Sequence, residues 1–346
     1  MEPTSTLTAD LQTRFTLARE AGILPNIHAV IAAHAGRTIF ETYFPGTDSA
    51  GPRPLGIVRF GPETLHDLRS VTKSIVGLLY GIALSTGHVP PPESPLLDHF
   101  PEYPDLAADP ARRALTIAHV LSMTLGTEWD ESTLPYSDPR NSEIAMDRAA
   151  DRCRYVLERP IIEPPGQRWI YNGGATAVLA RLIAKGTGRP LHDYARDVLF
   201  NPLGLGPTEW RQGPHTEVSA ASGLRMTPRD LLRIGLAMLA NGQANGRQII
   251  PQSWLEACRT PAVQMPDGRS YGYHWYLGAV PTDNGAGGVL WEPTISAMGN
   301  GGQRLFLLPR LDIAVVVTAG SYNNFDSWRP PMALLRDVLL PAILHP

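Results

Sequence analysis

The placement of strand-like segments at both ends of the chain, with helix-like segments between them, most restricts the fold. Residues 28–34 and 38–44 flank a glycine-containing turn and predict a hairpin near the N-terminus. Residues 302–308 and 312–318 flank Pro309-Arg310 and predict a second hairpin near the C-terminus. The segments that look helical lie between the hairpins, at residues 115–121, 143–157, 175–185 and 225–240. This order favours a strand-containing domain built from both chain ends and interrupted by a helical one.

A serine and a lysine begin one of the predicted helices. From residue 71 the apolar residues recur with helical spacing, which predicts a buried helix that starts at Ser70 and ends near Gly87. The segment Ser70-Val71-Thr72-Lys73 places the two polar side chains at i and i+3, on one face of that helix. Lys73 and Lys185 are the only lysines in the 346 residues, and arginine supplies the other basic side chains apart from histidine.

This pairing predicts a nucleophile and its base. Serine is a weak nucleophile until a base takes its proton. A desolvated lysine amine can be that base, whereas the guanidinium of arginine stays protonated. We expect partial burial and the positive end of the helix dipole to favour the neutral amine of Lys73. The competing interpretation is that Ser70 only caps the helix and Lys73 is a surface charge.

The composition excludes several classes of protein. The net charge is -3, and no basic run with interleaved aromatics would follow a phosphate backbone, so we expect no nucleic-acid partner. The longest apolar segments, residues 75–84 and 311–318, are far shorter than the roughly 20 residues of a membrane span, so we expect no membrane partner either. Residues 1–20 carry polar and charged side chains where a secretory signal would be apolar. Together with two isolated cysteines, this predicts a cytoplasmic protein.

No metal or cofactor motif is present. The chain has no His-Glu-x-x-His, no Walker loop, no intact dinucleotide fingerprint and no Gly-x-Ser-x-Gly elbow. Cys153 and Cys258 give no metal spacing, and His28, His34 and His119 lie where structural histidines are common. We therefore expect neither a metal site nor a cofactor.

Several segments together resemble the serine β-lactamase and penicillin-binding-protein superfamily, and within it the class C-like branch of esterases and amidases. The resemblance extends over nearly the whole chain, and the segments that carry it follow the family's order. They are residues 68–74, 115–123, 164–174, 201–205, 222–226 and 299–309. The resemblance implies an α+β, β-lactamase/transpeptidase-like fold, in which an antiparallel sheet built from both chain ends and flanked by helices lies beside an inserted all-helical domain. The domains expected are residues 1–86 (α/β, with the serine helix), 87–213 (mainly helical) and 214–346 (α/β).

The resemblance also implies the catalytic residues. Ser70 would be the nucleophile and Lys73 its base, and Tyr171, in a glycine-rich loop, would relay a proton to the leaving group. The usual Tyr-x-Asn of the family reads Tyr171-Asn172-Gly173 here, so Asn172 is the substrate-binding candidate, although displaced by one position. An intact pattern at Tyr322-Asn323-Asn324 follows the last strand, and we interpret it as turn chemistry.

A third motif of the family, Lys-Thr-Gly, cannot be present, because no lysine follows Lys185. The glycine-rich residues 299–303 stand in its place, and Asn300, Gly301 and Gly302 are candidates for substrate binding and for the second N–H of an oxyanion hole beside that of Ser70. Which N–H this is stays open, and a tight turn would use the same glycines. The missing lysine argues for neutral or differently held acyl substrates. Tyr136 is a further candidate, since relatives resembling oligomeric nylon hydrolases carry a similar loop.

The sequence thus predicts a serine hydrolase that cleaves a small-molecule carboxylic ester or amide through an acyl-enzyme on Ser70. True β-lactamase or D-amino peptidase activity is an alternative, but export and a Lys-Thr-Gly motif would support it and neither is indicated. An acyltransferase using the same acyl-enzyme and a catalytically silent binding protein are further alternatives. The oligomeric state stays open.

Overall fold

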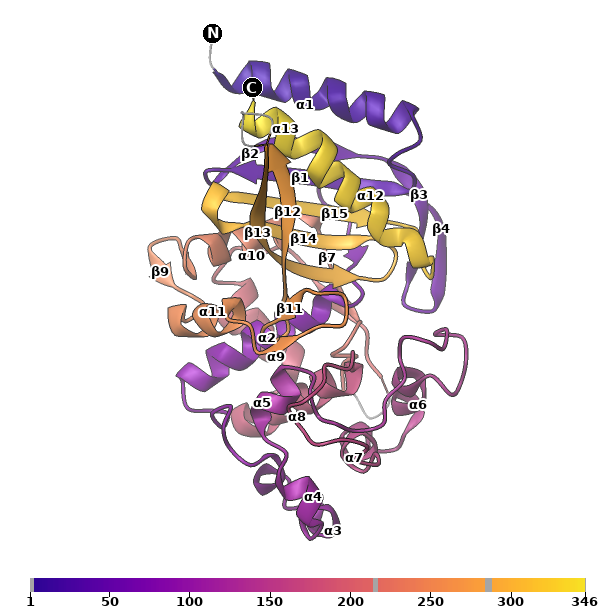
Figure 1. Cartoon of the computed structure of the whole chain (residues 1–346), viewed down its shortest axis with the longest axis vertical. Coiled ribbons are helices and arrows are strands. Elements are labelled where there is room, and N and C mark those ends of the chain that lie inside the picture. Colours follow the sequence, from indigo (N-terminus) through magenta and orange to yellow (C-terminus); the bar gives the residue numbers. More distant parts are fainter. Residues whose placement is uncertain (1–2, 214–216, 284–287, 346) are drawn as a thin grey trace.

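An eight-stranded antiparallel sheet forms the centre of the computed structural model, which describes residues 3–213, 217–283 and 288–345 (Figure 1). The N-terminal strand β1 lies between β2 and the C-terminal strand β15, so both chain ends build the sheet. In spatial order the strands are β10 (Val263–Gln264), β11 (Ser270–Tyr271), β12 (Tyr276–Asp283), β13 (Val289–Gly299), β14 (Gln303–Leu308), β15 (Ile313–Ala319), β1 (Ile27–His34) and β2 (Arg37–Tyr43).

Helices cover both faces of the sheet. On one face lie α1 (Pro3–Glu20) and the C-terminal helices α12 (Arg329–Ala333) and α13 (Leu340–Leu344), which a helical stretch over 334–339 connects (Figure 1). The other face packs against α2 (Val71–Ser85) and α10 (Pro228–Leu239). Alternate residues of β1 serve the two faces: Val30 and Ala32 point to the first core, and Ile31 and Ala33 to the second. This alternation explains why β1 is apolar throughout.

A mainly helical part lies beyond α2, on the side away from the sheet (Figure 1). Its helices are α3 (Pro104–Ala107), α4 (Pro110–Arg113), α5 (Ile117–Leu121), α6 (Ser142–Arg148), α7 (Arg152–Leu157), α8 (Gly173–Thr187) and α9 (Leu191–Ala195). Helix α11 (Gln252–Arg259) packs against α2 near Gly77 and Gly81. The domain boundaries expected from the sequence stay a prediction.

Three small sheets complete the fold. The strands β3 (Pro45–Ala50) and β4 (Arg53–Arg59) form an arm, and β8 (Gln243–Ala244) pairs with β9 (Arg247–Gln248). In the third sheet β7 (Leu224–Met226) lies between β5 (His66–Asp67) and β6 (Glu209–Trp210). This last sheet ties the segment that precedes Ser70 to residues more than 140 positions later. Within the described ranges, we find no helix with the length and hydropathy of a transmembrane segment.

Both predicted hairpins and the buried helix after Ser70 are confirmed, and two helix predictions need correction. The helix expected over 143–157 is two helices, because the backbone is extended at Ala149 and the Asp151 side chain caps α7. The helix expected over 225–240 begins at Pro228, since residues 224–226 form β7. Thr227 caps it by accepting from the Asp230 N–H, as the Thr-Pro-Arg-Asp pattern indicates.

Helix α2 is buried from Val71 to Ala83, which is unusual for a helix that carries a lysine. Glycines on this helix allow neighbours to approach its backbone. A Cβ at Gly81 would lie 2.0 Å from a ring carbon of Trp254, and the indole N–H of Trp254 donates to the Gly77 carbonyl at 2.9 Å. The indole of α11 thus occupies the space that a side chain on α2 would need.

Substituting Gly81→Ala should therefore destabilise the protein even though alanine favours helix. The methyl group overlaps the Trp254 ring, and overpacking of this kind costs about 1–3 kcal/mol. Urea denaturation should show a lower free energy of unfolding. The matched control is Gly61→Ala, where the nearest atom to the new methyl is 3.9 Å away and little change is expected; an equal loss in both variants would contradict this account.

Candidate active site

Ser70 occupies the N-cap position of α2 with its hydroxyl free of any capping bond. Its backbone has φ -70° and ψ -6°, and the side chain accepts nothing from the helix N-terminus. Instead the Lys73 Nζ donates to Ser70 Oγ at 3.1 Å. The interpretation of Ser70 as a mere helix cap is therefore wrong, and its hydroxyl is available for chemistry.

A constrained turn fixes Ser70 in this position. Arg69, directly before it, has φ +50°, a left-handed conformation that non-glycine residues seldom adopt. The turn is held because Asp67 Oδ1 accepts from the Arg69 N–H at 2.9 Å and the Arg69 guanidinium lies 4.3 Å from the centroid of the Tyr322 ring. Among the described residues the Ser70 N–H has no hydrogen-bond partner, so it is available as a donor for an oxyanion hole.

Lys73 is buried in a cluster of oxygen atoms. Its side chain is 3% exposed, and Nζ lies 3.4 Å from Glu131 Oε1, 3.6 Å from Glu143 Oε2 and 3.0 Å from the Ala221 carbonyl oxygen, to which it donates. Burial disfavours the ammonium, but Glu143, Tyr171 and Glu131 outweigh burial and raise the pKa of Lys73 well above its usual value. The neutral amine expected from the sequence is therefore wrong for the resting site, which holds an ammonium.

The two glutamates have different surroundings. Glu131 Oε2 accepts from the Gly173 N–H at 2.6 Å and from the Trp129 indole N–H at 3.0 Å, whereas Glu143 Oε1 accepts from the Ser222 hydroxyl at 3.0 Å. Burial is the main factor that raises the pKa of Glu131 to about 8, and the neighbouring Glu143 adds to it. Burial also opposes ionisation of Glu143, but the Lys73 ammonium, Glu131 and Ser222 lower the pKa of that carboxyl to about 2.

Tyr171 joins the cluster, as the sequence predicts. Lys73 Nζ lies 4.8 Å from the centroid of its ring, and Lys73 and the Ser70 hydroxyl both act on the pKa of its phenol. Burial raises the pKa of Tyr171, although Lys73 opposes this, so the phenol is protonated at rest. Tyr136 belongs to the same cluster through Glu131, because its hydroxyl donates to Glu131 Oε1 at 3.2 Å.

Asn172 caps helix α8. It is buried at the N-cap, where its side-chain oxygen accepts from the Ala175 N–H at 3.0 Å. The one-residue displacement from the family pattern therefore gives the side-chain oxygen of this asparagine a structural partner. The substrate-binding role of Asn172 stays a prediction.

The predictions for residues 300–302 also need correction. These residues form the turn between β13 and β14; the Asn300 amide donates to Asn323, Gly301 packs on the Tyr322 ring, and Gly302 packs against the C-terminal segment. It is Gly299 that lies against the segment preceding the serine, since a Cβ there would be 2.5 Å from the Leu68 carbonyl oxygen and 3.1 Å from Arg69 Cβ. The sequence reasoning found the correct segment but placed its contact with the site one to three residues too late.

The turn interpretation of residues 322–324 is confirmed. Asn323 has φ +59°, and the Asn324 side chain accepts from the Asp326 N–H. The Tyr322 hydroxyl donates to Asp48.

Glu131, Glu143 and the Ala221 carbonyl were not predicted from the sequence. A lysine in an otherwise apolar helix needs an anionic partner, so that pattern could have indicated a buried carboxylate. It could not have identified which one, because Glu131 and Glu143 are 58 and 70 positions from Lys73 and follow no common spacing.

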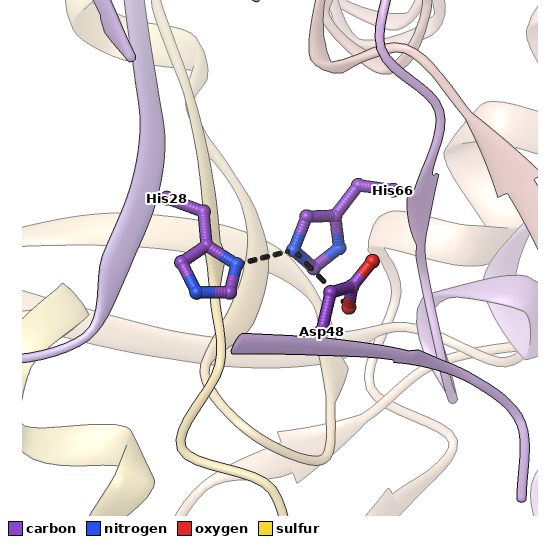
Figure 2. Close-up of side chains that lie close together, drawn as sticks. All are labelled: His28, Asp48 and His66. Atoms are coloured by element: carbon purple, nitrogen blue, oxygen red, sulfur yellow. Dashed lines mark hydrogen bonds and ion pairs between the residues drawn. The ribbon is translucent and has the colours of Figure 1, made fainter. Parts of the chain in front are cut away.

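His28, Asp48 and His66 are a buried group with metal-binding atoms close together, all within 4.8 Å (Figure 2). His28 Nδ1 and His66 Nε2 are 2.9 Å apart and hydrogen bonded to each other, and His66 Nδ1 contacts the Asp67 carbonyl at 3.0 Å. Burial lowers the pKa of both histidines, so the rings are neutral. Because the ring-to-ring bond uses the nitrogen atoms that would bind a metal, we interpret the group as a structural network that fastens the β3–β4 arm.

Comparison with known proteins agrees with this geometry. The profile of the family described as Beta-lactamase matches residues 28–333. The chain belongs to the beta-lactamase family. That match includes the sheet strands from β1 to β15, and Ser70, Lys73 and Tyr171 with them.

Within the beta-lactamase family, the relatives include amide and ester hydrolases. The chain is 27% identical over 290 residues to the 6-aminohexanoate-dimer hydrolase of Paenarthrobacter ureafaciens, covering 78% of this chain and 69% of the relative. It is 26% identical over 207 residues to Esterase EstB of Burkholderia gladioli, covering 58% and 51%. The structure of EstCE1, a hydrolase with promiscuous acyltransferase activity, matches the fold with a TM-score of 0.75 at 18% identity, over 98% of this chain and 100% of that one.

The cap role of Asn172 predicts a loss of stability on substitution. Asn172→Ala should lower the free energy of unfolding by about 1 kcal/mol, because the Ala175 N–H loses its acceptor. Asn172→Ser keeps a capping oxygen and should retain most of the stability, as measured by urea denaturation. Equal stability of the alanine variant and the wild type would contradict the cap role.

Proposed function

We propose that this protein is a serine hydrolase that cleaves a carboxylic ester or small amide through an acyl-enzyme on Ser70. The single observation that carries the proposal is the uncapped Ser70 hydroxyl, which accepts from Lys73 Nζ at 3.1 Å, with the Tyr171 ring beside that lysine. A nucleophile with two proton-transfer groups close to it is the arrangement that acyl transfer requires.

The reaction would proceed in two halves. Ser70 Oγ attacks the acyl carbon while its proton passes to the Lys73–Tyr171 pair, and the carbonyl oxygen takes up the electron pair. When the tetrahedral intermediate collapses, the bond to the leaving group breaks and the Tyr171 phenol, paired with the Lys73 ammonium, protonates the departing oxygen or nitrogen. A water molecule then repeats the attack on the acyl-enzyme and releases the acid.

The oxyanion hole would combine the Ser70 N–H with a donor from β13. The pairing of β12 with β13 ends at Ser296, so residues 297–299 pair only with β14 in the described part of the sheet. This free edge adjoins the segment directly before the serine, since Gly299 lies against Leu68 and Arg69. A backbone N–H of residues 297–299 is therefore our candidate for the second donor.

Two observations support esters and small amides as the substrate class. The relatives with the matches given above are named as an esterase and as a hydrolase of 6-aminohexanoate dimer. No lysine follows Lys185, so the Lys-Thr-Gly lysine that helps hold the penicillin carboxylate in the superfamily has no counterpart. We therefore favour a neutral acyl group over a penicillin.

Rapid-quench intact mass spectrometry tests the proposal directly. The wild type mixed with a short-chain aryl ester should gain the mass of the acyl group and then turn over, and Ser70→Ala should show no adduct and lose at least about 10³-fold in rate. Ser85→Ala, an exposed serine on the same helix, is the matched control and should acylate normally. A lasting adduct with penicillin instead would favour the penicillin-recognising alternative, and no adduct with either compound would refute the enzyme.

Tyr171→Phe keeps the ring and removes the proton-transferring hydroxyl. Its kcat/KM with the aryl ester should fall by about 10²–10⁴-fold, the range for one general acid–base group. Because an aryl oxide is a good leaving group, the loss should be larger with an alkyl ester or anilide. The same loss on every leaving group would show that Tyr171 only packs the site.

A further inference from the structure

The proposed mechanism leaves one requirement open, because Lys73 is an ammonium at rest and must lose a proton before it can accept that of Ser70. The groups around Nζ define where the proton can go. Glu131 and Glu143 approach Nζ at 3.4 and 3.6 Å, and their side chains are 0% and 6% exposed. Lys73 Nζ donates a hydrogen bond to Glu131 Oε1, which gives the proton a direct path to that carboxyl group.

The two carboxyl groups converge on Lys73 and on the start of α8. Both approach Nζ, and a Cβ at Gly173 would lie 2.9 Å from Glu143 Oε2 and 3.0 Å from Glu131 Oε2. Two carboxyl groups this close are favourable together only when they share a proton. Glu143 Oε2 is buried and has no hydrogen-bond partner in the described part of the chain. Such an orphaned acceptor, next to a second carboxyl group, indicates a proton shared by the pair.

Charge balance gives the same result. Two carboxylates and one ammonium would leave a net negative charge in a buried site, which is costly. One proton on the pair leaves a single negative charge opposite Lys73 and makes the cluster neutral.

We propose that Glu131 and Glu143 hold one proton between them and form the acceptor through which Lys73 loses its own proton when Ser70 is activated. The two glutamates contact Lys73 rather than the reacting atoms, so they are positioning residues. The proposal rests on the proposed function, which it deepens by supplying the missing proton acceptor.

The steps balance. In the form of the pair that has lost its resting proton, a proton moves from Lys73 Nζ to Glu131 Oε1, which leaves an amine and one protonated carboxyl group. Ser70 Oγ then forms its bond to the acyl carbon while its proton returns Nζ to the ammonium state. The Lys73–Tyr171 pair then protonates the leaving group. Finally, the proton on the glutamate pair returns to Lys73 Nζ, which restores the ammonium.

Proton transfer from Lys73 is easiest when the glutamate pair has lost its resting proton. The acceptor is then Glu131, whose pKa is raised to about 8, rather than Glu143, whose pKa is lowered to about 2. The free amine should therefore form more readily as pH rises through about 8. The rate of acylation should follow this rise.

The facing phenols and His274 titrate away from this range, because burial raises the pKa of the phenols and lowers that of His274 to about 4. The facing groups are Lys73 on α2, Tyr136 and Tyr171 in the loops before α6 and α8, Asp147 on α6, Arg211 directly after β6, and Tyr271, His274 and Tyr276 around β11 and β12. Burial also raises the pKa of Asp147, so Asp147→Asn joins the variants tested. A transition near pH 8 that Asp147→Asn leaves in place is assigned to the glutamate pair.

The first test is the pH profile of kcat/KM for an aryl ester, corrected for spontaneous hydrolysis. The wild type should rise through about pH 8, and Glu131→Gln should lose this limb and about 10²-fold in rate on its alkaline side. Glu131→Asp should keep the limb, and Glu143→Gln should move it to lower pH, because Glu131 then faces the Lys73 ammonium alone. Glu128→Gln, an exposed carboxylate three residues away, is the matched control and should match the wild type.

The second test needs no substrate and separates the two proposals. Infrared difference spectroscopy of the free protein should show the C=O stretch of a protonated carboxyl group that disappears near pH 8 in the wild type and is absent from Glu131→Gln. This band with no acylation of Ser70 would support the pair and refute the proposed function. Acylation without the band, or a limb that stays unchanged in both glutamine variants, would overturn the pair and leave the hydrolase intact.

Discussion

The buried charge of Lys73 is the interaction on which the site and much of the fold depend. An ammonium in the core is stable only if anionic and carbonyl oxygens surround it, and breaking such a buried pair typically costs about 3–5 kcal/mol. Here the oxygens come from Glu131, Glu143 and Ala221, which lie in three segments far from α2 in sequence. Satisfying one lysine therefore joins the helical part, the loop before β7 and the serine helix in one arrangement.

The same cluster orders its surroundings. Glu131 accepts from the first N–H of α8 at Gly173, where a helix N-terminus stabilises negative charge. A side chain on Gly173 would collide with both glutamates, since its Cβ would lie 2.9 Å from Glu143 Oε2 and 3.0 Å from Glu131 Oε2. The Gly-Gly after Tyr171-Asn172 is thus explained by the carboxyl groups, and through them Tyr171 is placed beside Ser70.

The sequence predicted those features that depend on local patterns. The two hairpins, the helix after Ser70 and the Thr227 cap each follow from periodicity or from a few adjacent residues. The protonation state of Lys73 was wrong because the prediction considered burial and the helix dipole, whereas the glutamate side chains within 3.6 Å of Nζ decide it. Those contacts depend on how distant segments meet, and no spacing in the chain records that.

The position of β1 has a consequence for synthesis on the ribosome. Its edge pairs with β15, with Ile27 opposite Ala319, so the strand made first gains this neighbour only when almost the whole chain has been made. Helix α2 is likewise complete long before Ala221 exists to receive its lysine. The β15 side of β1 and the apolar surface of α2 thus wait for their final neighbours through much of translation, and pairing between segments so far apart in sequence slows folding.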